Sequence, residues 1–372
     1  MLAQTPPMGW NSWNTFGSNI NEQLIFEIAD AMVDKGYRDA GYEYLVIDDC
    51  WSCRERDRSG KLVADPEKFP HGMKYVADYV HSKGLKFGMY SAAGIMTCAG
   101  YPGSYGHEYQ DAHTFAEWGV DYLKYDLCHY PGSGDVRNSY LTMSMALRST
   151  GREILFAGCT CGTYDPWDWM RSIGAHMYRS HADITDEYEA FRYIAQTQLP
   201  NFKYSGPGCF NDMDMLVVGM GGEGNVSHTG GCTDEEYLMH FSLWCLWGTP
   251  LMMGADIRNV NEYCRSVMLN RELIALNQDP DARAPFYEEK QRYASKARMG
   301  LLKFLANGEI VIAYYNFDIN PLQVLLYFDD YGIPGGSNYG LELTDILTGE
   351  NIGVKFDCYN PTLPGRSFKI YK

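Results

Sequence analysis

The chain has 372 residues, 45% of them hydrophobic, and a formal net charge of −16 at pH 7. This length allows a large core and favours about two domains. The acidic balance disfavours nucleic acid as a partner, since a polyphosphate would meet a repulsive field. The N-terminus lacks a basic segment followed by an apolar run, and no run of about 18 apolar residues occurs. We therefore expect no membrane span, no export signal and a cytoplasmic location.

The first three-quarters of the chain alternates short β-prone runs with segments of helical periodicity. This pattern is typical of a parallel sheet covered by helices. The predicted strands lie near residues 8–10, 44–48, 86–90, 122–126, 154–157, 176–180, 209–212 and 250–253. Apolar residues recur at helical spacing near 25–32 and 73–80, with Gly36 and Gly84 as stop signals. Thr233 with Glu236 indicates a capping box.

These elements predict an α/β protein, with a (β/α)8 TIM barrel over residues 1–284 as the catalytic domain. Beyond residue 284 helical periodicity disappears, and β-prone runs at 301–305 and 310–315 flank the dipeptide Asn307-Gly308. An Asn-Gly dipeptide between two such runs is a strong hairpin signal. We therefore predict a small antiparallel β-sandwich domain over residues 285–372.

Cysteine usage indicates buried thiols more than a disulfide framework, because eleven cysteines in a chain of this size do not make a small disulfide scaffold, and an odd count leaves at least one without an intrachain partner. Cys50 with Cys53, or Cys159 with Cys161, could form a pair of zinc ligands. Neither pair has a second ligand pair at the spacing of a zinc finger. We predict no metal.

The active site of a TIM barrel lies at the carboxyl ends of its strands. Polar and aromatic residues gather where the predicted strands end, and they include several carboxylates, one lysine and one arginine. Such a mixture suits a sugar, because hydroxyls need hydrogen-bond partners, apolar sugar faces pack on aromatic rings, and glycosidic cleavage needs two carboxyl groups. These residues are Trp13, Asp48, Asp49, Tyr90, Lys124, Asp126, Cys159, Cys161, Arg179, Asp183 and Asp214.

Two aspartates are candidates for the chemistry. Asp126 ends a strand next to Lys124, whose charge favours the ionised form that a nucleophile needs. An aspartate at a strand end can equally cap the following loop. Asp183 lies four residues after Arg179, so it is either a general acid or half of a local ion pair.

Other candidates have structural alternatives too. The doublet Asp48-Asp49 can hydrogen-bond a sugar or bind a cation. The nearby lysine and arginine would compete with a cation for these carboxylates. Trp13 and Tyr90 fit a barrel core as well as a sugar-stacking role.

Four segments closely resemble glycoside hydrolase family 27, the melibiase-like family of α-galactosidases and α-N-acetylgalactosaminidases. They are TPPMGWNSWN at 5–14, LVIDDCW at 45–51, TCAGYPGS at 97–104 and YLKYDLC at 122–128. The resemblance runs from Met8 to Pro280 and implies a barrel, a small C-terminal β domain and no metal or organic cofactor.

The resemblance also implies roles for individual residues. Asp126 would be the nucleophile and Asp183 the acid/base, with a raised pKa, of a retaining two-step mechanism. The terminal sugar would contact Trp13, Asp48, Asp49, Tyr90, Cys98, Lys124, Arg179 and Asp214. The Asp48-Asp49 pair would hold O4 and O6 of a galacto-configured ring, and Lys124 would reach O3 and O4. Cys98 and Cys128 match a pair that is commonly disulfide-linked in this family.

The chain departs from the family at the loop after the fifth strand. A glutamate that contacts the 2-hydroxyl in α-galactosidases is replaced by Thr160, and Thr163 and Tyr164 follow. In size these three resemble the loop of α-N-acetylgalactosaminidases, so the preference at C2 is open. Phe210 and Met213 replace a family tryptophan and proline and alter the packing beneath Asp214.

Three hypotheses follow. The leading one is a retaining exo-α-galactosidase that hydrolyses terminal α-linked galactose from oligosaccharides or glycoconjugates. The second is an α-N-acetylgalactosaminidase acting on terminal α-N-acetylgalactosamine. The third is a non-catalytic sugar-binding protein or regulator, which would be expected to lack a catalytic carboxylate, whereas both are present. No sequence pattern predicts an oligomeric state.

Overall fold

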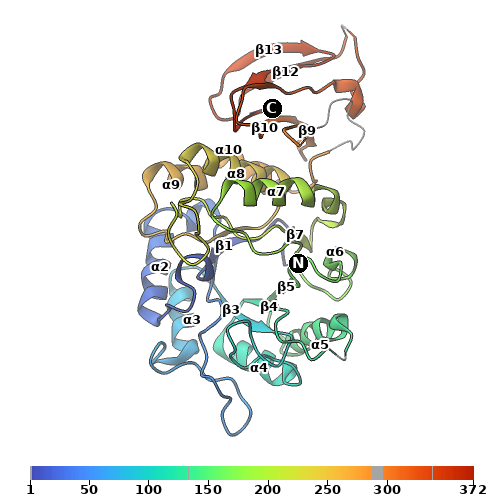
Figure 1. The fold of residues 1–372 in the computed structure, drawn as a ribbon. Coiled ribbons are helices and arrows are strands. Elements are labelled where there is room, and N and C mark those ends of the chain that lie inside the picture. The colour runs from blue at the N-terminus through green and yellow to red at the C-terminus, as the bar shows by residue number, and fades with distance from the viewer. Residues whose placement is uncertain (1, 133, 287–295, 337) are drawn as a thin grey trace.

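The computed structural model describes residues 2–132, 134–286, 296–336 and 338–372. Its larger part is a barrel of eight parallel strands surrounded by helices (Figure 1). The strands are β1 (Met8–Asn11), β2 (Tyr44–Val46), β3 (Lys86–Ala92), β4 (Tyr122–Asp126), β5 (Leu155–Cys159), β6 (Met177–Arg179), β7 (Phe210–Asp212) and β8 (Leu251–Met253). Their order is β7-β6-β5-β4-β3-β2-β1-β8. A parallel bridge between Leu216, just after β7, and Met253 closes the barrel, so the predicted TIM barrel is confirmed.

Every predicted barrel strand is present, with shifted ends. The strand β2 ends at Val46, two residues before the predicted Asp48. The reason is local, because the Asp48 backbone N–H donates to the Ser12 hydroxyl at 3.0 Å and leaves the strand ladder. Asp48 and Asp49 therefore lie in the loop that follows the strand.

Helices cover the outside of the barrel, and the three that local signals predicted, near residues 25–32, near residues 73–80 and after Thr233, are present. Thr233 and Glu236 form the predicted capping box at the start of α8. Gly36 and Gly84, with φ of +84° and +72°, follow the ends of α2 and α3 and supply the left-handed conformation that terminates a helix. The helices are α1 (Trp13–Phe16), α2 (Glu22–Asp34), α3 (Gly72–Ser82), α4 (Glu108–Trp118), α5 (Val136–Ser149), α6 (Pro166–Trp169), α7 (Tyr188–Gln198), α8 (Asp234–Trp247), α9 (Glu262–Met268) and α10 (Arg271–Asn277), with 3-10 turns η1 (Arg38–Ala40), η2 (Leu199–Tyr204) and η3 (Phe328–Tyr331).

The C-terminal part consists of small antiparallel sheets beside α8 and α10 (Figure 1). The predicted hairpin at Asn307-Gly308 is confirmed, since it joins β9 to β10. The sheets are β15-β10-β9, β11-β14 and β12-β13, from β9 (Arg298–Phe304), β10 (Ile310–Asn316), β11 (Leu322–Gln323), β12 (Gly340–Thr344), β13 (Asn351–Phe356), β14 (Thr362–Leu363) and β15 (Ser367–Tyr371). The predicted boundary between residues 284 and 285 stays a prediction, and residues 287–295 and 337 of that predicted domain lie outside the described residues.

Helix α8 joins the two parts of the structure. Glu236, in its first turn, forms an ion pair of 2.6 Å with Arg366. The Ser242 hydroxyl lies 3.1 Å from the Tyr315 hydroxyl. Near its end, the buried ammonium of Lys303 donates to the carbonyl oxygen of Leu246 at 3.1 Å. Because α8 contacts both the barrel and the C-terminal sheets, nearly all of its side chains are buried.

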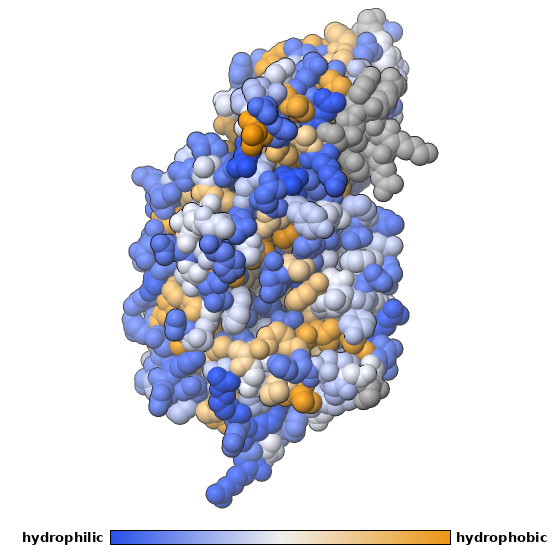
Figure 2. Space-filling model, in the orientation of Figure 1, coloured by the Kyte–Doolittle hydropathy of each residue, from blue (hydrophilic) through white to orange (hydrophobic). Residues whose placement is uncertain are grey.

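The outer surface in the view of Figure 2 is mostly hydrophilic, with apolar residues in small groups among the polar ones. Within the described part of the chain, no helix combines the length and apolar character needed to cross a membrane.

Thr233→Ala should lower the free energy of unfolding by about 1 kcal/mol, because the Glu236 backbone N–H at the start of α8 loses its hydrogen bond to the Thr233 hydroxyl. Urea titration followed by fluorescence measures the change. Thr142→Ala, at a partly exposed position inside α5, is the matched control and should change stability by less than about 0.5 kcal/mol. Equal stability of Thr233→Ala and the control would contradict the capping role.

Candidate active site

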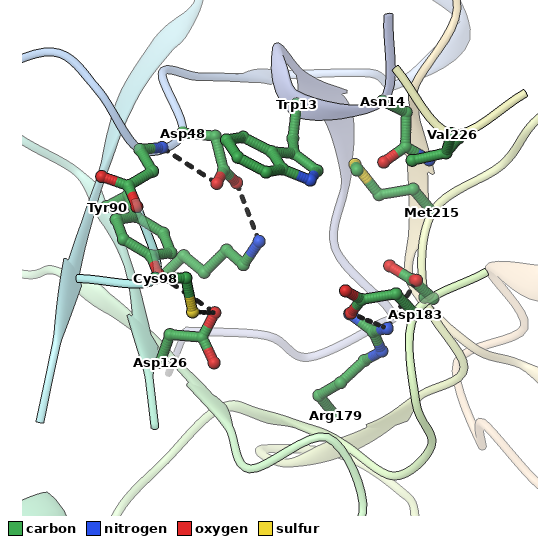
Figure 3. A pocket seen from close by; sticks show the side chains of 13 residues that line it. Trp13, Asn14, Asp48, Tyr90, Cys98, Asp126, Arg179, Asp183, Met215 and Val226 are labelled. Carbon is green, nitrogen blue, oxygen red and sulfur yellow. Dashed lines mark hydrogen bonds and ion pairs between the residues drawn. The ribbon is translucent and has the colours of Figure 1, made fainter. Parts of the chain in front are cut away.

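A cavity lies at the carboxyl ends of the barrel strands (Figure 3). Ten residues predicted from the sequence line it, from elements that are far apart in the chain. They are Trp13, Asp48, Asp49, Tyr90, Cys98, Lys124, Asp126, Arg179, Asp183 and Asp214.

Asp126 ends β4 and is 8% exposed. Its two carboxylate oxygens have separate donors, the Leu127 backbone N–H at 2.8 Å and the Tyr90 hydroxyl at 3.2 Å. Parallel pairing of β3 with β4 sets Tyr90 beside Lys124 and Ala92 beside Asp126. These contacts hold the carboxylate in one orientation at the rigid end of a strand.

Lys124 and Asp48 form an ion pair of 2.8 Å across the same side of the pocket. The Asn11 amide also donates to Asp48, at 2.7 Å. Burial lowers the pKa of Lys124, but the charges of Asp48 and Asp126 outweigh that effect and hold the pKa well above its usual value. Lys124 is therefore a permanent cation in this pocket.

Asp49 lies beside Asp48 and is held by backbone donors. The Ala99 N–H donates to it at 2.9 Å and the Cys50 N–H at 2.7 Å. Burial raises the pKa of Asp49, although these hydrogen bonds partly oppose the shift.

The opposite side of the pocket is built around Arg179, which ends β6 and is 4% exposed. Its Nη2 lies 2.5 Å from Asp214 and 2.9 Å from Asp183. The Asp183 side chain is 73% exposed and lies at the pocket opening. Asp126 and Asp183 thus come from different sides of one cavity (Figure 3).

The pKa values on this side are set by several carboxyls that share one guanidinium. Burial raises the pKa of Asp214 to about 6, with further raising by Asp183 and Asp212 against the lowering effect of Arg179. Partial desolvation raises the pKa of Asp183, but the charges of Arg179 and Lys124 outweigh it and the net shift is downward. The prediction of a raised pKa at Asp183 is therefore wrong, because its carboxylate is largely exposed and directly paired with Arg179.

Asp214 also has an unusual backbone, with φ of +86°. Its carboxylate accepts from the Ile184 N–H at 2.7 Å, and its carbonyl accepts from the Trp244 indole at 2.8 Å. Phe210 and Met213, which replace the family residues, are fully buried beneath it. Strained conformations of this kind persist only where surrounding contacts enforce them, and they concentrate at functional sites.

Three further residues line the pocket that sequence reasoning missed: Asn14, Met215 and Val226. Asn14 is buried, and its Nδ2 has no hydrogen-bond partner within the described residues. An unsatisfied buried amide donor at a cavity wall is suited to a ligand hydroxyl. Its place in the motif Trp13-Asn14 was a signal for it, whereas Met215 and Val226 gave none.

Comparison with known proteins adds to this geometry. The family Melibiase_2, described as alpha galactosidase A, matches residues 5–279. Alpha-galactosidase A of Cellvibrio japonicus is 47% identical over 289 residues, which are 75% of this chain and 68% of that protein. An alpha-galactosidase of Cyamopsis tetragonoloba is 50% identical over 279 residues, 75% of this chain and 65% of that protein. The chain thus spans about two thirds of the length of these relatives.

Solved structures of alpha-galactosidases have a similar fold. Alpha-galactosidase I from Mortierella vinacea has a TM-score of 0.92 and 32% identity, covering 100% of this chain and 97% of that one. The alpha-galactosidase of Saccharomyces cerevisiae with raffinose has a TM-score of 0.87 and 29% identity, with 100% and 97% coverage.

This chain belongs to glycoside hydrolase family 27. It is therefore a glycoside hydrolase of the α-galactosidase type, and its TIM barrel with antiparallel C-terminal sheets is the fold of its family 27 relatives. The resemblance found in the four sequence motifs is confirmed.

The loop after β5 of this family 27 enzyme differs from its predicted place. Thr160, Thr163 and Tyr164 are not among the residues that line the pocket. Thr160 is buried, and its hydroxyl donates to the Thr163 carbonyl at 2.7 Å while the Thr163 hydroxyl donates to the Thr160 carbonyl at 2.6 Å. Tyr164 is 58% exposed. The two threonines satisfy each other inside the loop, which the sequence could not show.

Cys98 and Cys128 are joined as a disulfide with a Cα–Cα distance of 5.0 Å, as the family resemblance implied. The bridge connects the loop after β3 with the loop after β4, beside Tyr90 and Asp126. It therefore ties together two of the loops that form the pocket wall.

Cys128→Ser should lower the free energy of unfolding by about 3 to 4 kcal/mol, because the bridge closes a loop with a sequence separation of 30 residues in the unfolded chain. Guanidinium titration without reductant measures the loss. Cys53→Ser, at a free cysteine in another loop, is the matched control and should keep wild-type stability within about 1 kcal/mol. A wild type as stable with strong reductant as without it would contradict the contribution of this bridge.

Proposed function

We propose that this chain is a retaining exo-α-galactosidase that removes terminal α-linked galactose from oligosaccharides or glycoconjugates. The observation that carries the proposal is the placement of Asp126 and Asp183 on opposite sides of one small acidic pocket. A pocket, unlike an open groove, accepts only the end of a sugar chain, which would account for exo action. The family and its relatives named as alpha-galactosidases support the choice of galactose.

The pocket holds more acidic than basic groups, with five aspartates against Lys124 and Arg179. An excess of negative charge stabilises an oxocarbenium-like transition state, whose sugar ring becomes positive. Asp48, Asp49 and Lys124 are placed to accept and donate hydrogen bonds to ring hydroxyls. Trp13, half-buried at the start of α1, offers an aromatic face to the apolar side of the ring.

In the first step, an oxygen of Asp126 attacks the anomeric carbon as the bond to the leaving oxygen breaks. Asp183 donates its proton to that oxygen, and a covalent glycosyl ester forms on Asp126. In the second step, Asp183 takes a proton from water, the water oxygen attacks the anomeric carbon, and the ester bond breaks. Two inversions give galactose with retained configuration.

Asp183 must be protonated for the first step. The substrate would cover this exposed carboxyl, and loss of solvent raises the pKa of an acid. Asp214 and Asp183 titrate together around Arg179, so their apparent pKa values belong to the pair.

The direct test compares nitrophenyl α-galactoside, its 2-acetamido analogue and raffinose as substrates of the purified protein. We expect cleavage of the α-galactosides and release of the α-anomer first, which NMR detects. Faster cleavage of the 2-acetamido analogue would assign the enzyme as an α-N-acetylgalactosaminidase, the alternative that the small loop residues Thr160 and Thr163 favour. Inertness toward all three would overturn the proposal.

Asp126→Gly should abolish turnover, since the nucleophile is lost, and azide should restore part of it as a β-galactosyl azide product. Asp168→Asn, at an exposed position on α6, is the control and should keep wild-type turnover. Full turnover by Asp126→Gly would disprove the two-step mechanism.

Asp183→Asn should lower kcat/KM for raffinose by about 100- to 10,000-fold, because its leaving oxygen needs a proton. Its effect on nitrophenyl α-galactoside should be smaller, since nitrophenolate leaves without one. Equal losses on both substrates would remove Asp183 from the acid role.

The pH profile provides a further prediction. The acid form is lost as pH rises, so kcat/KM should fall on the alkaline side as the Asp183–Asp214 pair ionises. Asp214→Asn removes a negative neighbour of Asp183, which lowers the pKa of Asp183 and should move the alkaline limb to lower pH. Profiles of kcat/KM against pH for both proteins test this shift, and an unmoved or upward-moved limb would contradict the coupling.

A further inference from the structure

Two free thiols lie beside the proposed nucleophile. Cys159 ends β5 and Cys161 follows two residues later, and their sulfur atoms are 3.7 Å apart. The Asp126 carboxylate completes a group whose ligand atoms all lie within 4.8 Å of one another. Neither thiol has a role in the proposed mechanism.

The spacing of the two sulfurs matches a metal site. In a tetrahedral zinc site, with Zn–S bonds of about 2.3 Å, two sulfur ligands lie about 3.8 Å apart. The free thiols of Cys159 and Cys161 already have this separation. A carboxylate oxygen of Asp126 lies within 4.8 Å of both sulfurs.

The backbone holds this geometry in place. Cys161 has φ of +48°, a left-handed conformation that costs energy in a residue with a side chain. The intervening Thr160 is turned into the loop by its hydrogen bonds with Thr163. Both sulfurs lie on the side of Asp126, since the ligand atoms of the three residues are within 4.8 Å of one another.

A fourth ligand is within reach as well. Asp183 Oδ1 lies 4.0 Å from the Cys161 sulfur. Either this carboxylate or a water molecule can complete a tetrahedral shell. The group is therefore bordered by both carboxylates that the proposed function makes catalytic.

We propose that Cys159, Cys161 and Asp126 form a binding site for a thiophilic divalent cation such as Zn²⁺ or Cd²⁺, and that the bound cation inhibits the enzyme. Each thiol loses its proton as its sulfur binds the metal, so about two protons are released per ion and no electrons are transferred. Inhibition follows because the metal occupies the Asp126 carboxylate. Only this inhibition rests on the proposed function, and the binding does not.

The first experiment tests binding: Cd²⁺ is added to the 372-residue protein after reduction with a phosphine and desalting. We expect thiolate-to-cadmium absorption that saturates at one ion per chain, with release of about two protons in weak buffer. Cys161→Ser should lose this absorption, and the half-buried position of Cys161 makes serine tolerable. Cys53→Ser, the matched control, should keep it. Absorption that survives in Cys161→Ser, or that is absent from the wild type, would overturn the site.

Folding of the variants is checked by their thermal unfolding. If Cys161→Ser fails to fold, Cys161→Ala and Cys159→Ser take its place, and protection of wild-type Cys161 from alkylation by Cd²⁺ gives an independent reading. Alkylation of Cys161 at the same rate with and without Cd²⁺ would equally overturn the site.

The second experiment tests inhibition: the rate of hydrolysis of nitrophenyl α-galactoside is measured at increasing Zn²⁺ concentration, and each protein is compared with its own metal-free rate. Wild type should be inhibited and recover on chelation, whereas Cys161→Ser should need at least about tenfold more Zn²⁺. Metal binding without inhibition would overturn the inhibitory role. Cd²⁺ binding by a protein inert toward every galactoside would reject the proposed function while leaving the metal site intact.

Discussion

Arg179 is buried at the end of β6, where a guanidinium is tolerated only with anionic partners close by. Asp214 provides one at 2.5 Å and Asp183 another at 2.9 Å. Asp214 in turn takes a left-handed backbone that is held by Ile184 and Trp244. Removing one member would leave a buried charge unpaired, so the whole β6–β7 side of the pocket depends on this ion pair.

The other side of the pocket follows the same physical rule with different residues. Lys124 is paired with Asp48, and Asp126 is held by a backbone N–H and by Tyr90. One side thus presents a firmly oriented carboxylate, and the other an exposed carboxylate that can lose solvent and gain a proton. This difference in surroundings separates the proposed nucleophile from the proposed acid, although both are aspartates.

The loops around the pocket and one helix support it. The disulfide between Cys98 and Cys128 joins the loops after β3 and β4, and the loop after β5 is closed on itself by Thr160 and Thr163. Helix α8 fixes the barrel to the C-terminal sheets through Glu236 and Arg366. Cys159 and Cys161 lie on either side of Thr160, so the hydrogen bonds between Thr160 and Thr163 help to hold their two sulfurs at a short spacing.

The sequence by itself determined the barrel and the β9–β10 hairpin, because periodicity, helix caps and the Asn-Gly turn are local signals. It also identified nine pocket residues, since parallel strands bring their carboxyl ends to one place, and the family resemblance added Cys98. The tertiary structure alone decided the loop of Thr160, where two side chains satisfy each other, and the pocket residues Met215 and Val226, which carry no local signal. It also reversed the expected pKa shift of Asp183, because a pKa depends on the charges and solvent around a group, and these come from residues distant in sequence.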